Sequence, residues 1–347
     1  MSTDTKPINN VLDLLKLIAI AGVVAIHTLA GNTDVAKHIS PILQAFSVPV
    51  FLVISAYLRA KKMKKIGVRG AYQPKYMFVS FMSLMLGYIF IVVFEILGCL
   101  PLQKHGMPLP LETHFLDSIP DFLYWLFTGT LGFGSYYIPV MVELIVFLPL
   151  LFLLFKKNKN IGLVACFVIN LAYDLLSHFL CMPSEAYRIL IFRFTFILGC
   201  GIYLGLMEER GKKEDIDAGI FLVLGIVYII INTFVYEFPI FGSWSSSSMI
   251  VGFFAYGYFY FMTKKFSGIS YHRIFVFGKA SYHIFLVQML FFFFYGNRVL
   301  EKITAPLPIG AAIPLQILIA LLITFVLGWL FYLLETRLRK ALKIAHS

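Results

Sequence analysis

The stretch from Leu12 to Thr28, "LDLLKLIAIAGVVAIHT", holds two features that conflict inside a membrane. It is an apolar run close to the roughly 20 residues that a spanning helix needs. It also carries Asp13 and Lys16 near its start and His27 near its end. Charged and titratable groups are costly in hydrocarbon and usually face a protein interior or a watery cavity. The run therefore predicts a spanning helix with one polar, functional face.

The composition of the whole chain also favours a membrane. Of its 347 residues, 60% are hydrophobic and 14% are charged, whereas soluble domains are about 25% charged. The mean hydropathy is +0.85. Such a chain cannot cover its apolar surface with polar groups, so we expect an all-α polytopic membrane protein with a single domain over residues 1–347. The first apolar run lacks a small-residue cleavage site, which favours a retained span over a signal peptide.

Hydropathy divides the chain into ten candidate spans of about bilayer length. Their approximate bounds are 11–30, 41–58, 76–98, 136–155, 160–178, 188–206, 217–236, 247–263, 279–297 and 311–335. If the N-terminus is cytoplasmic, the loops on its side are 59–75, 156–159, 207–216 and 264–278, followed by the tail from residue 336.

These segments, with Lys6, hold 21 of the 29 Lys and Arg residues, a clear positive-inside bias. We therefore predict cytoplasmic N- and C-termini in a multi-pass protein of the plasma membrane, most simply a bacterial inner membrane. The bias also explains the net charge of +11 without a nucleic-acid partner.

Residues 99–135 form the longest predicted segment outside the spans. Its second half, "DFLYWLFTGTLGFGS" (Asp121–Ser135), is too short to span comfortably, and its aromatic residues suit an interfacial or re-entrant helix. The segment is either a lid over a site or an interfacial plug. Cys99 and Cys181 both fall near the predicted outer face, so a disulfide between them is one alternative. The four cysteines match no zinc pattern, and no metal is expected.

Several ionisable residues within the predicted spans have simple structural explanations. Lys279, Asp13 and Glu335 lie near span ends, where side chains can reach the interface or cap a helix. Asp174 and His178 are one turn apart near an outer end and can pair with each other, and Glu95 can reach the outer interface. Glu143 lies mid-helix among apolar residues and needs a partner, for which Arg193 is one option.

The three polar residues of the opening stretch share one helix face. Lys16 and His27 are eleven residues apart, which is about 20° past three full turns and about 16 Å along the axis. Asp13 precedes Lys16 by three residues and joins the same stripe. Imidazole accepts and returns a proton near neutral pH, as the transfer of an acyl group onto a hydroxyl requires. The stripe predicts a polar-lined path with an acid and a cation at one end and a base farther in.

Several segments of the chain resemble, in order, motifs of the acyltransferase 3 family of multi-pass membrane O-acyltransferases. The first is "DLLKLIAIAGVVAIH", which matches the family at Asp13 and His27 and has Lys16 where the family has Arg. "VPVFLVISAYL" (Val48–Leu58), "SYYIPVMVELIVFLPLL" (Ser135–Leu151) and "GKASYHIFLVQ" (Gly278–Gln288) resemble later motifs, and "LLETRLRK" (Leu333–Lys340) resembles the terminal one. The resemblance covers nearly the whole chain, and the length fits members without an extracellular domain.

The resemblance implies a reaction and roles for named residues. Family members are thought to transfer an acyl group, commonly acetyl from cytoplasmic acetyl-CoA, to a hydroxyl of a glycan or glycolipid at the other face. His27 would be the base, and Lys16 with Asp13 would position the donor or the base. The family also carries a basic pair in the loop after the second span, for which Arg69 and Lys75 are the nearest candidates. A basic cytoplasmic mouth suits the phosphate groups of CoA.

Five further residues are candidates for lining the substrate path, namely Glu143, Arg193, Ser281, Tyr282 and His283. The chain is thus predicted to be an acyl-CoA-dependent O-acyltransferase that acts on an extracytoplasmic or lipid-linked glycan in the bilayer, with acetyl-CoA or another acyl-CoA as donor and no metal. The alternative is a transporter or flippase of a small polar or lipid-linked substrate that uses the same stripe. Transporters often contain two repeated halves, and the absence of a sequence repeat favours the enzyme.

Overall fold

The computed structural model describes residues 5–30, 33–105, 118–128, 132, 134–208, 210–294 and 296–341, and these contain helices and no strand. The all-α prediction is confirmed. The helices are α1 (Thr5–Leu29), α2 (Thr33–Phe46), α3 (Val48–Ala71), α4 (Pro74–Lys104), α5 (Ile119–Thr128), α6 (Tyr137–Leu154), α7 (Lys159–Phe179), α8 (Ser184–Ile189), α9 (Thr195–Leu206), α10 (Lys212–Phe234), α11 (Val251–Lys265), α12 (Phe275–Lys279), α13 (Ser281–Phe293), α14 (Gly296–Thr304) and α15 (Ile309–Ala341), with 3-10 turns η2 (Ile191–Phe194) and η3 (Pro239–Ser247).

The number of membrane-length helices is smaller than the ten predicted spans. Within the described residues, seven candidates are long and apolar enough, with α2 and α3 counted together from Asp34 to Ala71. The pair α13 and α14, bent by 72°, makes up to eight. Two predicted spans, 188–206 and 247–263, contain shorter helices, α9 and α11. The 3-10 turn η2 occupies the start of the first span, and in the second α11 begins only at Val251, after η3 has ended at Ser247. Hydropathy detects apolar length and does not detect such breaks.

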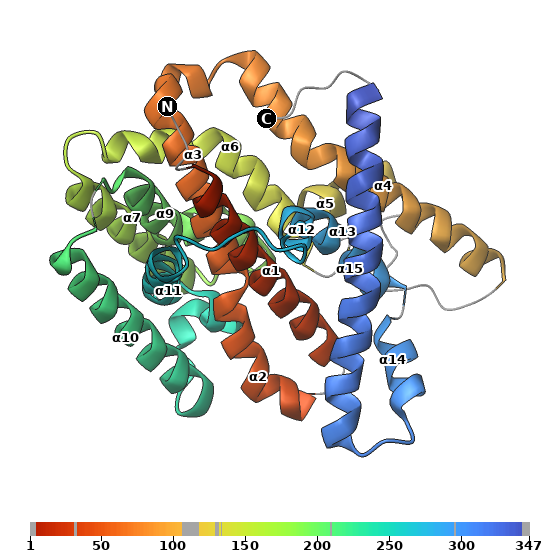
Figure 1. Ribbon diagram of the computed structural model, residues 1–347. Helices are drawn as coiled ribbons and strands as arrows, with labels where there is room; N and C mark the ends of the chain where they lie inside the picture. Colours follow the sequence, from red (N-terminus) through yellow and green to blue (C-terminus); the bar gives the residue numbers. More distant parts are fainter. Residues whose placement is uncertain are drawn as a thin grey trace.

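Helix α1 lies at the centre of the bundle (Figure 1). In the membrane-spanning part of α1, 61% of the residues are buried, whereas the buried share is 17% in α10 and in α15. Two hydrophobic clusters meet on α1. One is formed with α3, α6, α9 and α11, and the other with α4, α13 and α15. A helix that is buried on all sides can carry polar residues only where a cavity or a partner receives them.

The predicted cytoplasmic segments lie at one end of the molecule, which we call the basic face. Lys64 at the end of α3 pairs with Glu208 after α9 at 2.6 Å. Lys159 donates to the carbonyl of Leu206 at 3.1 Å. In Figure 1, α15 ends at the same end of the molecule at which α1 begins. The other end is called the opposite face. Whether the basic face or the opposite face lies on the cytoplasmic side stays a prediction.

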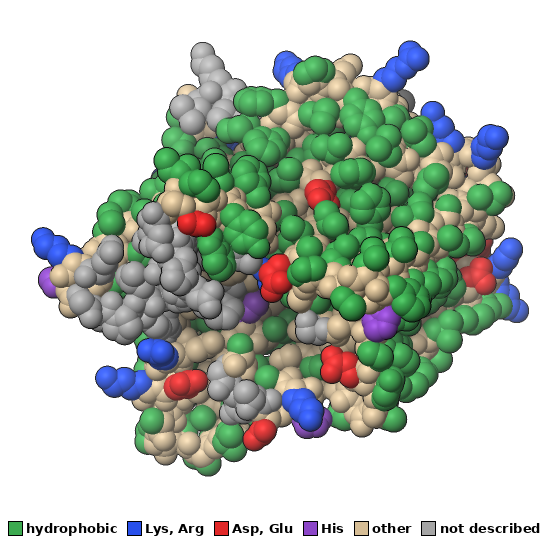
Figure 2. All heavy atoms as spheres, turned by 180° about the vertical axis from the view of Figure 1, so that it is seen from behind, with side chains coloured by type: hydrophobic (Ala, Val, Ile, Leu, Met, Phe, Trp, Pro, Cys, Tyr) green, Lys and Arg blue, Asp and Glu red, His purple; other side chains and the backbone are tan. Residues whose placement is uncertain are grey.

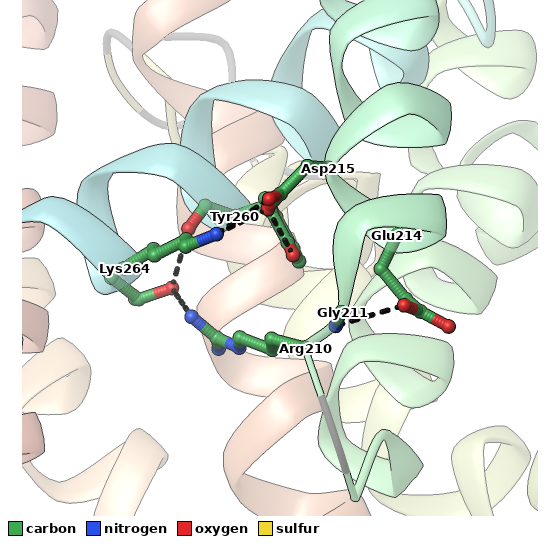
Figure 3. Close-up of polar contacts among 7 residues, drawn as sticks. Arg210, Gly211, Glu214, Asp215, Tyr260 and Lys264 are labelled. Atoms are coloured by element: carbon green, nitrogen blue, oxygen red, sulfur yellow. Dashed lines mark hydrogen bonds and ion pairs between the residues drawn. The ribbon is translucent and has the colours of Figure 1, made fainter.

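A polar cluster fixes the start of α10 against the end of α11 at the basic face (Figure 3). Lys264 donates to both carboxylate oxygens of Asp215, at 2.5 and 2.7 Å, and Tyr260 donates to the same carboxylate at 2.8 Å. Arg210 donates to the hydroxyl of Thr263 at 2.9 Å. The first turn of α10 is capped because the side chain of Glu214 accepts a hydrogen bond from the backbone N–H of Gly211. These contacts join the predicted loops 207–216 and 264–278.

The surface matches a protein embedded in lipid. Figure 2 shows one face of the molecule on which hydrophobic side chains form a broad surface and most visible Lys and Arg side chains lie toward the edges. Large apolar side chains on α7, α10 and α15 are exposed, including Ile161, Val223 and Leu322. Helices satisfy their own backbone hydrogen bonds, so this apolar exterior is stable in hydrocarbon and not in water.

Three details differ from the sequence-based predictions. Helix α3 continues to Ala71 through most of the predicted loop 59–75, with a break at Gly67, whose φ is +71°. All four cysteines are free, so the alternative of a Cys99–Cys181 disulfide is wrong, since Cys99 is buried and Cys181 is exposed. In the segment 99–135, the described residues contain the short exposed helix α5, and residues 106–117, 129–131 and 133 lie outside the described residues.

Candidate functional site

Three cavities follow one another along α1, and the first opens near the basic face. This mouth cavity, of about 620 Å³, is lined by Asn10, Asp13, Lys16, Tyr271 and Lys279 among others. Asp13 and Lys16 form an ion pair, with Oδ1 and Nζ 3.2 Å apart, and the Lys16 side chain is 24% exposed. The amino group of Lys279 lies 4.8 Å from the centre of the Tyr271 ring. The mouth therefore holds two cations and one carboxylate.

The middle cavity, of about 320 Å³, shares Lys16, Leu58 and Lys279 with the mouth cavity. Its remaining polar lining consists of Ser55, Arg59, Ser80, Ser83, Ser281 and Tyr282. A third cation, Arg59, thus joins Lys16 and Lys279 below the mouth. No Asp or Glu lines this cavity in the described part of the chain. A cavity with hydroxyl and cationic groups among apolar side chains is suited to a ligand that carries a polar group on a long apolar arm.

The third cavity, of about 230 Å³, contains the His27 side chain, and we call it the His27 cavity. Four residues line both it and the middle cavity, namely Val23, Val48, Tyr137 and Phe285. The Tyr137 and Phe285 rings meet edge to face at 5.5 Å between centroids. These two rings form a narrow aromatic partition between the cavities. The polar stripe of α1 therefore runs from an open mouth to the half-buried imidazole of His27.

His27 is positioned by elements far from it in sequence. Asn297 of α14 donates to the His27 carbonyl at 3.0 Å, and the imidazole lies 5.9 Å from the Phe292 ring. Gly134 adopts a φ of +82°, and a Cβ built there would stand 3.3 Å from His27 Nε2. Glycine at 134 therefore leaves room at Nε2 and permits a left-handed backbone that other residues adopt at a cost.

The segment 278–288 is packed directly against the polar end of α1. Gly278 of α12 touches the Asp13 backbone so closely that any Cβ there would overlap the Asp13 carbonyl. Ser281 and Tyr282 follow and line the middle cavity. The hydroxyl of Tyr282 donates to the carbonyl of Leu84 at 2.5 Å, which fixes α13 against α4.

His283 is placed elsewhere, in a buried network. Its Nε2 lies 2.5 Å from an oxygen of Glu335, whose other oxygen binds Arg339. Arg339 also donates to the hydroxyl and carbonyl of Ser83, at 3.1 and 2.8 Å. Glu335 is 2% exposed, so the expectation that it reaches the interface is wrong. His283 lines none of the three cavities, and the network joins α13, α15 and α4.

Glu143 and Arg193 have separate partners. Glu143 accepts a hydrogen bond from the backbone N–H of Ile191 at 2.6 Å. Arg193 is fully buried and donates to Ser247 Oγ at 2.5 Å and to the carbonyls of Trp244 and Ser247 at 3.3 Å. The option that the two form an ion pair is wrong, because η2 turns the backbone toward the carboxylate and the guanidinium toward η3.

The remaining predicted residues are also placed by the structure. Arg69 and Lys75 are exposed at the end of α3 and the start of α4, and they line none of the three cavities. Glu95 is 1% exposed instead of reaching the interface. Asp174 accepts from Asn170 and Tyr187, at 3.0 and 2.8 Å, rather than from His178. No three His, Cys, Asp or Glu side chains of the described residues are grouped so as to hold a metal ion.

Sequence reasoning missed four cavity residues that the structure brings together. Arg59 is the first residue of the basic run "RAKKMKKIGVR", and its place at the end of a predicted span was a usable signal. Gly134 precedes α6, Arg188 lies in the short helix α8 and Trp244 in the 3-10 turn η3, and none of the three carried such a signal. Arg188 and Trp244 line the His27 cavity with Gly134 although they are 54 and 110 residues away from it in sequence.

Comparison with known proteins agrees with this architecture. The family model described as acyltransferase domain, Acyl_transf_3, matches residues 9–333, nearly the whole chain, and it includes the polar stripe of α1 and the segment 278–288. The match supports acyltransferase activity in a multi-pass membrane protein. No curated protein and no solved structure matches the chain. With its helical bundle and a family match over almost its full length, the chain belongs to the acyltransferase 3 family.

Proposed function

We propose that the protein transfers an acyl group, most simply acetyl, from cytoplasmic acyl-CoA to a hydroxyl of an extracytoplasmic or lipid-linked glycan, with His27 as the base. The observation that carries the proposal is the row of three cavities, in which a cationic mouth leads toward the imidazole of His27. The family membership supports the reaction class. The basic face is then the cytoplasmic face of a plasma membrane, in keeping with the positive-inside bias.

The donor would enter at the mouth cavity. Lys16, Lys279 and Arg59 supply positive charge for the phosphate groups of CoA, and Asp13 holds Lys16 in place at 3.2 Å. Arg69 and Lys75, exposed on the same face, add to the field that attracts an anionic donor. The apolar walls of the middle cavity, including Phe51, Ile54 and Met141, suit the arm that carries the thioester.

The chemistry would take place at the partition between the middle and His27 cavities. The hydroxyl oxygen of the acceptor attacks the thioester carbonyl carbon, and the carbon–sulfur bond breaks. His27 accepts the hydroxyl proton and returns it to the departing thiolate, so the products are an ester and free CoA. A base within reach of the attacking hydroxyl typically accelerates such a step by about 10²–10⁴-fold. Separate cavities for donor and acceptor keep bulk water away from the thioester.

The proposal is tested with purified protein, acetyl-CoA radiolabelled in the acetyl group, and a panel of glycan acceptors. We expect CoA release and label transfer by the wild type, and a loss of about 100-fold or more in His27→Ala. The matched control is His105→Ala, because His105 is exposed after α4 and lines none of the cavities. Full activity in His27→Ala contradicts the assignment of the base. Glycan movement across a membrane without label transfer would support the transporter alternative.

A further inference from the structure

The His27 cavity has a cationic lining with no acidic counterpart. Arg188 of α8 lines it together with Tyr136, Trp244 and Ser247, and no Asp or Glu of the described residues does so. Burying a charged side chain costs free energy unless an oppositely charged group faces it. Among the described residues, the cavity lining supplies no such group for the half-buried Arg188.

Arg188 is held by aromatic rings and not by a carboxylate. Its guanidinium carbon lies 5.9 Å from the centre of the Tyr136 ring and 5.9 Å from that of Trp244. Its buried Nε has no hydrogen-bond partner within the described part of the chain. Glu185, three residues earlier, is exposed and interacts electrostatically with Arg188 from outside the cavity lining. The guanidinium is thus oriented at the cavity wall, and donor capacity is left over.

Neighbouring groups preorganise this arrangement. Trp244 Nε1 donates to Ser184 Oγ at 2.8 Å, and the Trp244 and Tyr136 rings meet at 5.3 Å. Arg193 stacks on Trp244 at 5.0 Å, but it is fully buried and does not line the cavity. Its Nη2 donates to Ser247, whereas its Nε and Nη1 have no hydrogen-bond partner among the described residues. Of the two arginines, Arg188 is therefore the one that a ligand in the cavity can reach.

We propose that the His27 cavity binds an acceptor that carries an oxyanion, a carboxylate or a phosphate, which Arg188 holds while Trp244 and Tyr136 contact the adjoining sugar ring. The inference rests on the proposed function and names the chemical class of its acceptor. Guanidinium groups bind carboxylate and phosphate through two parallel hydrogen bonds, which also fix orientation. The site would thus align one hydroxyl of the sugar with His27.

The size of the cavity limits what it can take. Its volume of about 230 Å³ is below the roughly 300–1,000 Å³ of ordinary ligand pockets. A neighbouring cavity of about 300 Å³ shares Trp244 and is lined by polar groups such as Ser177 and His178. The His27 cavity would therefore take the end unit of an acidic glycan, and the neighbouring cavity has room for the next unit.

A binding measurement tests the inference without relying on turnover. The full chain in detergent, in a Trp125→Phe/Trp329→Phe background that leaves Trp244 as the fluorophore, is titrated with glucuronate, inorganic phosphate and glucose. We expect a saturable fluorescence change with glucuronate, with phosphate, or with both, and none with glucose at the same concentrations. A response to glucuronate alone identifies a carboxylate-bearing sugar, and a response to phosphate alone identifies a phosphorylated or lipid-phosphate-linked one.

Variants then assign the binding to Arg188. Arg188→Gln should weaken oxyanion binding about 10- to 100-fold, the usual effect of removing charged hydrogen bonds. Lys302→Gln, which removes an exposed cation of α14 outside the cavity, should leave binding unchanged. If Arg188→Gln does not fold, Arg188→Lys carries the test, because it keeps the charge and loses the two-pronged geometry. Lysine at this position should bind more weakly than arginine.

The outcomes separate this inference from the proposed function. No oxyanion-dependent change in the wild type, equal binding of glucose, or equal affinity of the wild type and the Arg188 variants would overturn the inference. Acetyl-CoA turnover is measured on the same samples. Turnover without oxyanion binding leaves the acyltransferase standing with a neutral acceptor, whereas oxyanion binding without turnover on any acceptor counts against the proposed function alone.

Discussion

At position 16 a lysine stands where the family resemblance places an arginine. Lys16 contacts Asp13 through one amino group and lines two cavities. A lysine offers a compact point charge, whereas arginine offers a planar fork. A site that needs only positive charge near the donor accepts either residue, and one that needs a bidentate contact does not.

We therefore expect Lys16→Arg to retain substantial activity and Lys16→Ala to lose about 10-fold or more, since one charge-assisted hydrogen bond is worth a factor of this size. The measurement is the rate of CoA release as a function of acetyl-CoA concentration. Lys37→Ala removes an exposed lysine on the opposite face and is the control. Equal rates for the arginine and alanine variants would remove Lys16 from the donor site.

Gly134 is the second residue whose identity is set by its surroundings. Its φ of +82° favours glycine, and a Cβ at this position would stand 3.3 Å from His27 Nε2, so both features disfavour a larger residue. Gly134→Ala should cost about 1–2 kcal/mol in backbone strain. It should also lower the rate of acyl transfer at least about 10-fold, because even a small displacement of a catalytic group slows the reaction strongly. The measurements are thermal unfolding and label transfer.

The control separates strain from the contact with His27. Gly67 also has a positive φ, +71°, but a Cβ there meets nothing within 4 Å. Gly67→Ala should show similar strain and normal transfer. If both variants lose the same activity, strain alone explains the effect, and the close approach of Gly134 to His27 has no role in the reaction.

At the scale of helices, the apolar runs predicted α1, α4, α6, α7, α10 and α15, because segments of this length and composition are stable in lipid only as helices. The sequence did not reveal three features of the helices. These are the 3-10 turn η2 before α9, the bend between α13 and α14, and the continuation of α3 to Ala71. Each depends on tertiary contacts. The start of α9, for example, follows the hydrogen bond from Ile191 to Glu143.

The network of His283, Glu335 and Arg339 makes a prediction about helix packing. Arg339 is 6% exposed and joins α15 to α4 through Ser83. Arg339→Ala would leave the buried Glu335 without its cation, at a cost of about 3–5 kcal/mol. Thermal unfolding in detergent should show a large decrease in Tm, and the double variant Glu335→Gln/Arg339→Met should recover much of it.

The comparison variant is Lys64→Ala, which breaks the exposed pair with Glu208. Exposed pairs contribute little because water and salt screen them, so its Tm should stay close to that of the wild type. Equal effects of Arg339→Ala and Lys64→Ala would show that the α4–α13–α15 network does not stabilise the packing of these helices.

For the whole molecule, the central place of α1 determines what the chain can do. Its polar stripe was predictable from helical spacing alone, and the structure places cavities along it. The far walls were not predictable: Gly134, Arg188 and Trp244 reach the His27 cavity only because α6, α8 and η3 close over it. No spacing rule relates residues that come together through loops of different length.

The orientation of the molecule in the membrane is tested by cysteine accessibility. In a background without the four native cysteines, Lys65→Cys on the basic face should react with a membrane-impermeant thiol reagent only from the cytoplasmic side. Lys302→Cys on α14 should react only from outside, because both positions are exposed and lie at opposite faces. Labelling of Lys65→Cys from outside would reverse the proposed direction of transfer.

The central claim is that an acyl group passes from the basic face to an acceptor at the opposite face by way of His27. Oriented proteoliposomes with radiolabelled acetyl-CoA on the basic side and glycan acceptor on the other test it directly. The account predicts that labelled glycan accumulates on the far side with the wild type and not with His27→Ala, while His105→Ala behaves as the wild type. Absence of transfer by the wild type, or undiminished transfer by His27→Ala, would contradict it.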